Sequence, residues 1–153
     1  ALDHHEMLPV VSRHAFNQYL IHASDHVERT KEPSFLLFLK ILNVDNLWQK
    51  SGSALRDGFL IHAANVIKSC LEEVDVVGAL DNGEIGVIFN LYQEEAVIAQ
   101  ANVLTNLLKN SPLMIDDVEY PISIIWGSYE ILAQADPAQM ILTASENARN
   151  QSV

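Results

Sequence analysis

The chain has 153 residues, a length that fits one compact domain and leaves little room for a second. Apolar residues make up 49% of it, so a buried core can form and global disorder is excluded. Nine basic residues against twenty acidic ones give a formal charge of −11. This charge argues against a protein that binds nucleic acid or an anionic membrane. It is compatible with the binding of a small nucleotide that is held by local hydrogen-bond donors or by a cation.

Cysteine usage and hydropathy restrict the environment of the chain. Cys70 is the single cysteine, so neither an intrachain disulfide nor a cysteine-based zinc site can form, and a reducing cytoplasm fits best. The apolar runs are far shorter than the roughly 20 residues of a membrane span, and the start of the chain does not resemble a secretory signal. Because the chain begins with Ala1 rather than Met, we expect a fragment of a longer protein.

Hydrophobic periodicity predicts a first helix that Ser12 caps and that ends near Arg29. Its apolar stripe consists of Phe16, Tyr19, Leu20, Ala23 and Val27. After a charged break, the continuous apolar run 35–39 predicts a strand that is buried on both faces. A second helix is predicted from Ala54 to Glu73, with Cys70 on its apolar face as a core residue rather than a nucleophile.

A hairpin is predicted in the middle of the chain. Two apolar runs, 76–80 and 85–91, flank Asp81-Asn82-Gly83. Asn-Gly between two such runs is the strongest short-range hairpin signal, because both residues tolerate a positive φ. The two runs are therefore expected to pair as antiparallel strands.

The second half of the chain completes the fold prediction. A third helix is expected over 94–109, a further strand over 122–126, and a last helix that Pro137 opens. Without the first and last helices, the order is strand, helix, strand, strand, helix, strand, which is the split βαβ, ferredoxin-like arrangement. We expect one α/β (α+β) domain over residues 1–153, with an antiparallel sheet covered on one face by two helices and an extra helix at each end.

Three stretches resemble the GGDEF domains of the diguanylate cyclase family. Residues 8–20, LPVVSRHAFNQYL, resemble that family's LTGLxNRxxF entry segment. The turn Asp81-Asn82-Gly83-Glu84-Ile85 resembles its Gly-Gly-Asp-Glu-Phe signature, and Gly52 and Asp57 match two positions of its Tyr-Gly-His-x-x-Gly-Asp stretch. The resemblance spans nearly the whole chain and implies a nucleotidyl-cyclase-type fold and a part in bacterial cyclic di-GMP signalling.

The same resemblance implies a degenerate catalytic site. Active members join two GTP molecules into cyclic di-GMP and use metal ions held by two facing carboxylates. The first carboxylate position falls on Lys40, a cation where Mg²⁺ needs an oxygen ligand. In the hairpin, Gly83 stands at the family's aspartate position, although Glu84 is kept. Asp81 and Asn82 replace the two glycines that let phosphate approach the backbone.

Guanine recognition and product feedback also differ from the family's pattern. The asparagine expected to read guanine corresponds to Trp48, whereas Asp57 remains, so one of two base contacts is kept. The family's Arg-x-x-Asp product site matches residues 72–75, where Glu72 replaces the arginine, and we expect no product feedback. Two structural alternatives stay open: Trp48 as a packing anchor of its loop, and Asp57 as an ordinary helix-face charge.

Lys40 has its own structural interpretation. A cation at the metal-ligand position coincides with an additional carboxylate in the hairpin. This coincidence leads to the hypothesis that the Lys40 ammonium replaces the lost metal by pairing with Glu84 or Asp81. A catalytic lysine is disfavoured.

A histidine pair on the first predicted helix has two interpretations. His22 and His26 are four residues apart and share one helix face, a spacing at which two imidazoles can bind zinc. Only Asp25 and Glu28 offer further ligands nearby. Solvated helix-face histidines are therefore favoured over a metal site.

These departures predict a catalytically inactive GGDEF-type regulatory or interaction domain, with weak GTP binding at Asp57, Asn82, Gly83 and Glu84 as a variant. No catalytic residue, metal ligand or resident cofactor is expected, and Mg²⁺ enters only with bound GTP. The expected partners are neighbouring domains of the same chain, such as a sensor or an EAL phosphodiesterase domain, and GTP; nucleic acid and membrane insertion are not expected. Two alternatives stay open: an active diguanylate cyclase with an atypical metal site, and an unrelated ferredoxin-like interaction domain.

Overall fold

The computed structural model describes residues 10–42, 53–72, 74–80, 83–90 and 93–151, so the predictions for Trp48, Gly52, Asp81 and Asn82 lie outside the described residues. The helices are α1 (Arg13–Thr30), α3 (Ser53–Lys68), α4 (Glu94–Lys109) and α5 (Pro137–Gln151). The strands are β1 (Phe35–Ile41), β2 (Val76–Ala79), β3 (Glu84–Phe89), β4 (Leu113–Ile115), β5 (Val118–Tyr120) and β6 (Ile124–Glu130).

The four longer strands form an antiparallel sheet in the order β2-β3-β1-β6. The predicted hairpin is confirmed, because β2 and β3 pair antiparallel on either side of the Asn-Gly turn. Gly83, the last residue of that turn sequence, has φ 80°, in the left-handed region that glycine adopts without a steric penalty. A separate small sheet pairs β4 with β5.

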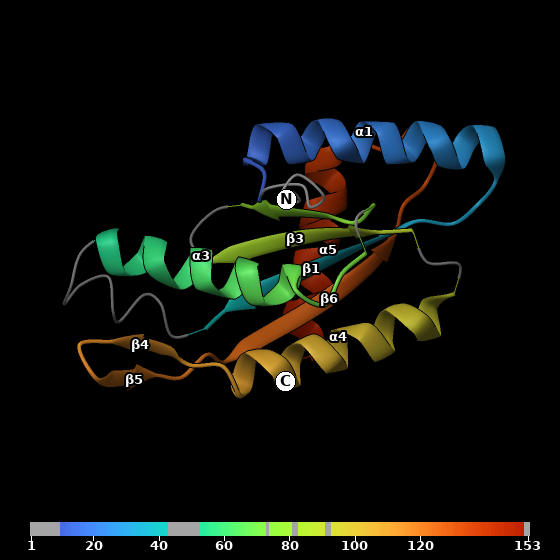
Figure 1. Ribbon diagram of the computed structural model, residues 1–153. Helices are drawn as coiled ribbons and strands as arrows, with labels where there is room; N and C mark the ends of the chain where they lie inside the picture. The colour runs from blue at the N-terminus through green and yellow to red at the C-terminus, as the bar shows by residue number, and fades with distance from the viewer. Residues whose placement is uncertain (1–9, 43–52, 73, 81–82, 91–92, 152–153) are drawn as a thin grey trace, which may run out of the picture.

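Helices cover both faces of the main sheet (Figure 1). Leu37 and Leu39 of β1 pack on the side of α3 and α4, whereas Leu36 and Phe38 pack on the side of α1 and α5. The prediction of a strand buried on both faces is thus confirmed. The extra helices at the two ends of the chain cover the second face, because alternate residues of β1 leave that face apolar as well.

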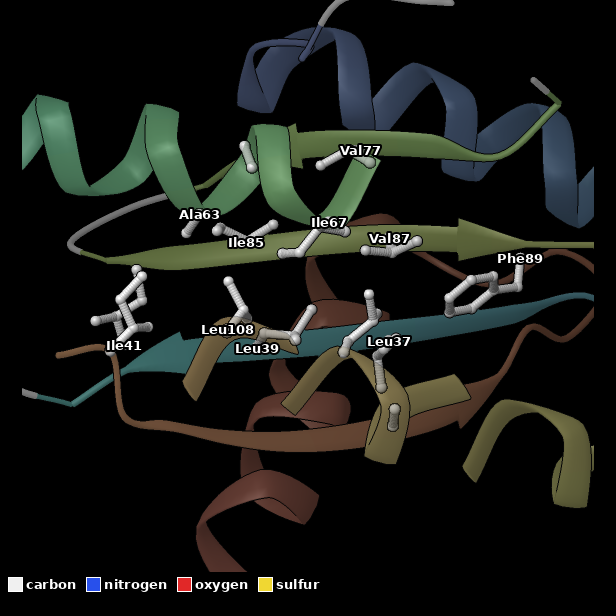
Figure 2. Packing of buried hydrophobic residues seen from close by; sticks show 14 of the residues in the cluster. Leu37, Leu39, Ile41, Ala63, Ile67, Val77, Ile85, Val87, Phe89 and Leu108 are labelled. Carbon is white, nitrogen blue, oxygen red and sulfur yellow. The ribbon is translucent and has the colours of Figure 1, made fainter. Parts of the chain in front are cut away.

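The core on the side of α3 and α4 supports the end of the sheet at which the predicted site lies (Figure 2). Side chains of β1, β2 and β3 meet there with those of the two helices. Those labelled in the figure are Leu37, Leu39, Ile41, Ala63, Ile67, Val77, Ile85, Val87, Phe89 and Leu108. Because Ile41 and Ile85 are each only 1% exposed, the ends of both strands are held in place by packing.

Helix α1 begins where the sequence predicts. The Ser12 hydroxyl accepts the backbone N–H of Ala15 at 3.2 Å, which confirms Ser12 as the N-cap. At the other end Lys31 has φ 63°, and its N–H donates to the carbonyl of Val27. The helix therefore ends at Thr30, one residue beyond the predicted end.

Two predictions about element boundaries need correction, and one hairpin was missed. Helix α3 ends at Lys68 rather than at Glu73, so Cys70 lies in the turn that follows, partly buried against the core. The strand predicted over 122–126 is β6, which runs further along the chain. The β4–β5 hairpin was not predicted.

None of the described helices is long and apolar enough to cross a membrane.

Candidate functional site

The end of β1 and the start of β3 bring two predicted site residues together. Lys40 lies directly opposite Glu84 in the antiparallel ladder. The backbone N–H of Ile41 donates to the carbonyl of Gly83 at 2.9 Å. Lys40 and Glu84 therefore form a non-hydrogen-bonded pair, the type in which opposite side chains approach most closely. The expected proximity is confirmed, whereas an ion pair between the two side chains stays a prediction.

Lys40 has a different neighbour on its other side. Its partner in the β1–β6 ladder is Ile125, which packs against the core under α1 and α5. Successive residues of a strand alternate between faces, so Lys40 shares a face with Phe38. The half-buried Lys40 thus stands between Glu84 and Ile125 in a row across the three strands.

These residues do not fit a divalent metal ion. Mg²⁺ requires oxygen ligands in a nearly octahedral arrangement. The row offers the carboxylate of Glu84, but the facing residue, Lys40, contributes a positive charge, and Gly83 has no side chain. Because like charges repel, the ammonium disfavours a second cation at the same place. No chemical step through a metal follows from this arrangement.

Of the other predicted nucleotide contacts, Gly83 directly precedes Glu84 in the chain, whereas Asp57 belongs to helix α3. Asp57 lies on the exposed side of α3, two residues before the buried Phe59. At this position the Asp57 carboxylate could contact a guanine base or could be an ordinary solvated charge on the helix surface. Both interpretations stay predictions. Asn82 lies outside the described residues.

A second candidate site is a cavity of about 300 Å³ between α1 and the strands β2 and β3. It is lined by Tyr19, His22, Ala23, His26, Arg29, Val74, Val76, Ile88 and Asn90. Sequence analysis named the two histidines but missed the cavity. The available signal was the spacing of three and four residues that places Tyr19, His22, His26 and Arg29 on one side of a helix.

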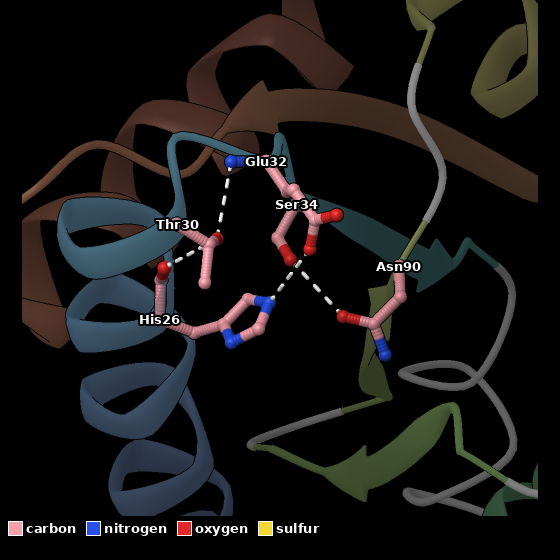
Figure 3. A network of polar contacts seen from close by, with 5 residues as sticks. All are labelled: His26, Thr30, Glu32, Ser34 and Asn90. Carbon is pink, nitrogen blue, oxygen red and sulfur yellow. Dashed lines mark hydrogen bonds and ion pairs between the residues drawn. The ribbon is translucent and has the colours of Figure 1, made fainter.

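A polar network borders this cavity (Figure 3). His26 Nε2 lies 3.4 Å from Glu32 Oε1, and Thr30 Oγ1 donates to the carbonyl of His26 at 2.8 Å while accepting the N–H of Glu32 at 3.1 Å. The Ser34 hydroxyl donates to Asn90 Oδ1 at 3.1 Å. Across the described part of the chain, no three His, Cys, Asp or Glu side chains are arranged to hold a metal. A zinc site on the histidine pair therefore gains no support.

Asp75, the acid kept at the predicted product site, binds the protein's own backbone. Its carboxylate accepts the N–H of Glu72 at 3.0 Å and that of Asn90. Burial raises the pKa of the Asp75 carboxyl above its ordinary value, and the two hydrogen bonds offset only part of that rise. Asp75 thus joins the turn before β2 to the end of β3.

Asp75→Asn should therefore change how stability depends on pH. Because the folded-state pKa of Asp75 lies above 3.8, the folded chain binds this proton more tightly than the unfolded chain. The contribution favours folding below pH 3.8 and is lost as the pH rises through the folded-state pKa. Urea titrations from pH 3.8 upward should show the free energy of unfolding of the wild type falling relative to that of the variant. A relative rise would contradict the assignment.

Comparison with protein families gives a match over almost the whole chain. The family model described as diguanylate cyclase, GGDEF domain, matches residues 4–152. Curated proteins give no match.

Solved structures agree in fold at low sequence identity. Diguanylate cyclase SiaD of Pseudomonas aeruginosa, in complex with its activator SiaC, is 13% identical with a TM-score of 0.83, and the match covers 92% of this chain and 54% of SiaD. The GGDEF domain of YfiN (TpbB) of the same organism is 22% identical, with a TM-score of 0.81 and coverage of 95% and 90%. The GGDEF domain of DgcB from Caulobacter crescentus, in complex with c-di-GMP, is 14% identical, with a TM-score of 0.83 and coverage of 99% and 90%.

Proposed function

This chain belongs to the diguanylate cyclase GGDEF-domain family, and we propose that it is a catalytically inactive member that acts as a regulatory or interaction domain in cyclic di-GMP signalling. The observation that carries the proposal is Lys40 directly opposite Glu84. Membership in the family excludes the alternative of an unrelated ferredoxin-like domain.

The charges at the end of the sheet argue against catalysis. Joining two nucleotides through a phosphoryl group depends on cations and donors placed around the developing negative charge. In this chain a lysine stands at one of the two carboxylate positions implied by the family resemblance, and Gly83 at another position gives no side chain at all. One carboxylate, that of Glu84, is left to serve the reaction.

Regulation through bound GTP and through protein contacts is compatible with the same residues. In the proposed arrangement GTP contacts Asp57, Asn82, Gly83 and Glu84 weakly, and a neighbouring sensor or EAL domain of a longer chain responds to its presence. The SiaD structure, in which a diguanylate cyclase is held by its activator SiaC, supports the idea that domains of this family take protein partners.

Incubation of the purified chain with GTP and Mg²⁺, followed by chromatography, tests the proposal. We expect no cyclic di-GMP, because the site offers too few oxygen ligands for metal-assisted transfer. An active diguanylate cyclase assayed in parallel shows that the conditions allow product to form. Product from the wild-type chain would overturn the proposal and favour an active cyclase with an atypical site. Product that arises only in Lys40→Asp would support lost catalysis.

A further inference from the structure

A cavity of about 270 Å³ lies between helix α3 and the edge of the sheet at β2. We call it the α3 cavity, and its lining consists of Val10, Leu60, Ile61, Asn65, Lys68 and Ala79. Most of these side chains are apolar, and Ile61 is 61% exposed, so the cavity is reached from solvent. Pockets that hold small molecules are mostly apolar with a few polar groups, which is the composition found here.

Helix α3 supplies one wall of the α3 cavity. Ile61, Asn65 and Lys68 follow one another at steps of four and three residues, so they lie along one side of the helix. The adjacent side carries Ala64 and Ile67, which are 1% and 0% exposed and pack into the core. These core contacts hold the wall in place.

The segment before α1 and strand β2 supply the opposite wall. The N–H of Val11 donates to the carbonyl of Val77 at 2.9 Å, and the N–H of Ala79 donates to the carbonyl of Val11 at 2.9 Å. These bonds fix the segment to the strand, and Val10 packs against the core on the side of α3. Because the side chain of Ala79 is a single methyl group, it leaves space that a larger residue would fill.

Lys68 gives the α3 cavity a positive charge. The residue is half-buried and belongs to the last turn of α3. The chain has twenty acidic residues, yet among the described residues no carboxylate forms an ion pair with Lys68. A cation beside apolar side chains is less screened by water than an exposed one and attracts an anion more strongly. The composition of the cavity therefore favours a ligand with an apolar body and one negative charge.

We propose that the α3 cavity binds a small amphipathic carboxylate, a free acid with a short alkyl chain. Its carboxylate pairs with Lys68, and its alkyl chain lies against Leu60 and Ile61. The volume is just below the roughly 300–1,000 Å³ of pockets for drug-sized molecules, so the ligand is smaller than those. The inference is independent of the proposed function, because none of the residues proposed to contact GTP lines this cavity.

Titration of octanoate into the isotope-labelled chain, followed by two-dimensional NMR, tests the proposal. We expect saturable shifts at the amides of Ile61, Lys68 and Ala79. Affinity should fall about fourfold for each methylene removed between octanoate and butanoate, because each methylene buries apolar surface. Octanol has an alkyl chain of the same length and no charge, and it should bind about ten- to a hundredfold more weakly than octanoate.

Three variants separate the contributions to binding. Lys68→Gln should lower the affinity for octanoate about ten- to a hundredfold, the loss expected for one charge-assisted hydrogen bond, and leave the affinity for octanol unchanged. Ala79→Leu should abolish the binding of both, because the larger side chain fills the cavity. Lys109→Gln, at an exposed lysine in the last turn of α4, is the matched control and should bind octanoate like the wild type. Circular dichroism of each variant verifies that the fold is kept.

Several results would overturn the inference. Octanoate that causes no saturable shifts would exclude the proposed ligand class, and equal affinities for octanoate and octanol would exclude the role of Lys68. An equal loss of affinity in Lys109→Gln would show an effect of overall charge rather than of this cavity. Binding of an acetylated peptide that ends in leucine, without binding of octanoate, would assign the cavity to a protein terminus instead.

Discussion

Phe16→Ala is expected to lower the free energy of unfolding by about 3–5 kcal/mol, the cost of removing a fully buried aromatic ring. Phe16 is 0% exposed and packs between α1 and the sheet. It lies over Gly78 and Gly86, which are opposite each other in the β2–β3 ladder. A Cβ on either glycine would lie 2.6 Å from the ring. Because Gly78 and Gly86 lie directly under the ring and have no side chains, neither of them can fill the cavity that the alanine leaves.

Urea denaturation of the variant measures this loss. Ile21→Ala, on the same helix but 47% exposed, is the matched control and should change the stability by no more than about 0.5 kcal/mol. A second test uses the contact itself: Gly86→Ala should destabilise the wild type and be better tolerated in the Phe16→Ala background, because the ring that it would meet is gone. Additive effects of the two changes would contradict this packing.

Gly127→Ala is expected to lower the free energy of unfolding by about 3 kcal/mol, at the upper end of the usual cost of overpacking. A Cβ on Gly127 would meet the backbone of Ala144 and Ala148 in α5, with Ala148 Cα at 2.9 Å. These are backbone atoms of a helix rather than the ends of flexible side chains. The whole of α5 must therefore move away from β6, and the packing of Ala144 and Ala148 is lost with it.

The control is Gly58, a glycine in a helix, whereas Gly127 lies in strand β6. A Cβ on Gly58, within α3, meets no atom within 4 Å. Gly58→Ala should therefore raise the stability by about 0.5–1 kcal/mol, because alanine favours the helix over the unfolded chain. Thermal and urea unfolding of both variants give the comparison. If Gly127→Ala and Gly58→Ala changed the free energy of unfolding in the same direction, the close approach of α5 to β6 would not be the cause of the loss expected for Gly127→Ala.

Sequence patterns predicted the longer elements well, because each of them carries a local signal. Helix α4 runs over the predicted residues, Glu94–Lys109, with two acidic residues in its first turn and Lys109 in its last. The N-cap Ser12 and the hairpin around Gly83 were found from side-chain capping and turn chemistry. These signals act over a few residues and need no partner from elsewhere in the chain.

The errors concern segments whose structure depends on distant contacts. Strands β4 and β5 have three residues each, too few to show alternation, and the turn between them uses Asp116 and Asp117 at φ 51° and 66° rather than Asn-Gly. The apolar pattern of the second helix continues past its real end at Lys68, because Cys70 still packs against the core from the following turn. The boundary of that helix is therefore invisible in periodicity alone.

The sequence by itself determined the types of the main elements, the acidic charge, and the departures from the family's signature, Lys40 and Gly83 among them. Only the tertiary structure decided that Lys40 stands directly opposite Glu84, that the outer helices cover the second face of the sheet, and that one side of α1 forms a cavity with Asn90. The physical reason is that periodicity reports what a segment buries, whereas register and packing depend on contacts between residues far apart in the chain.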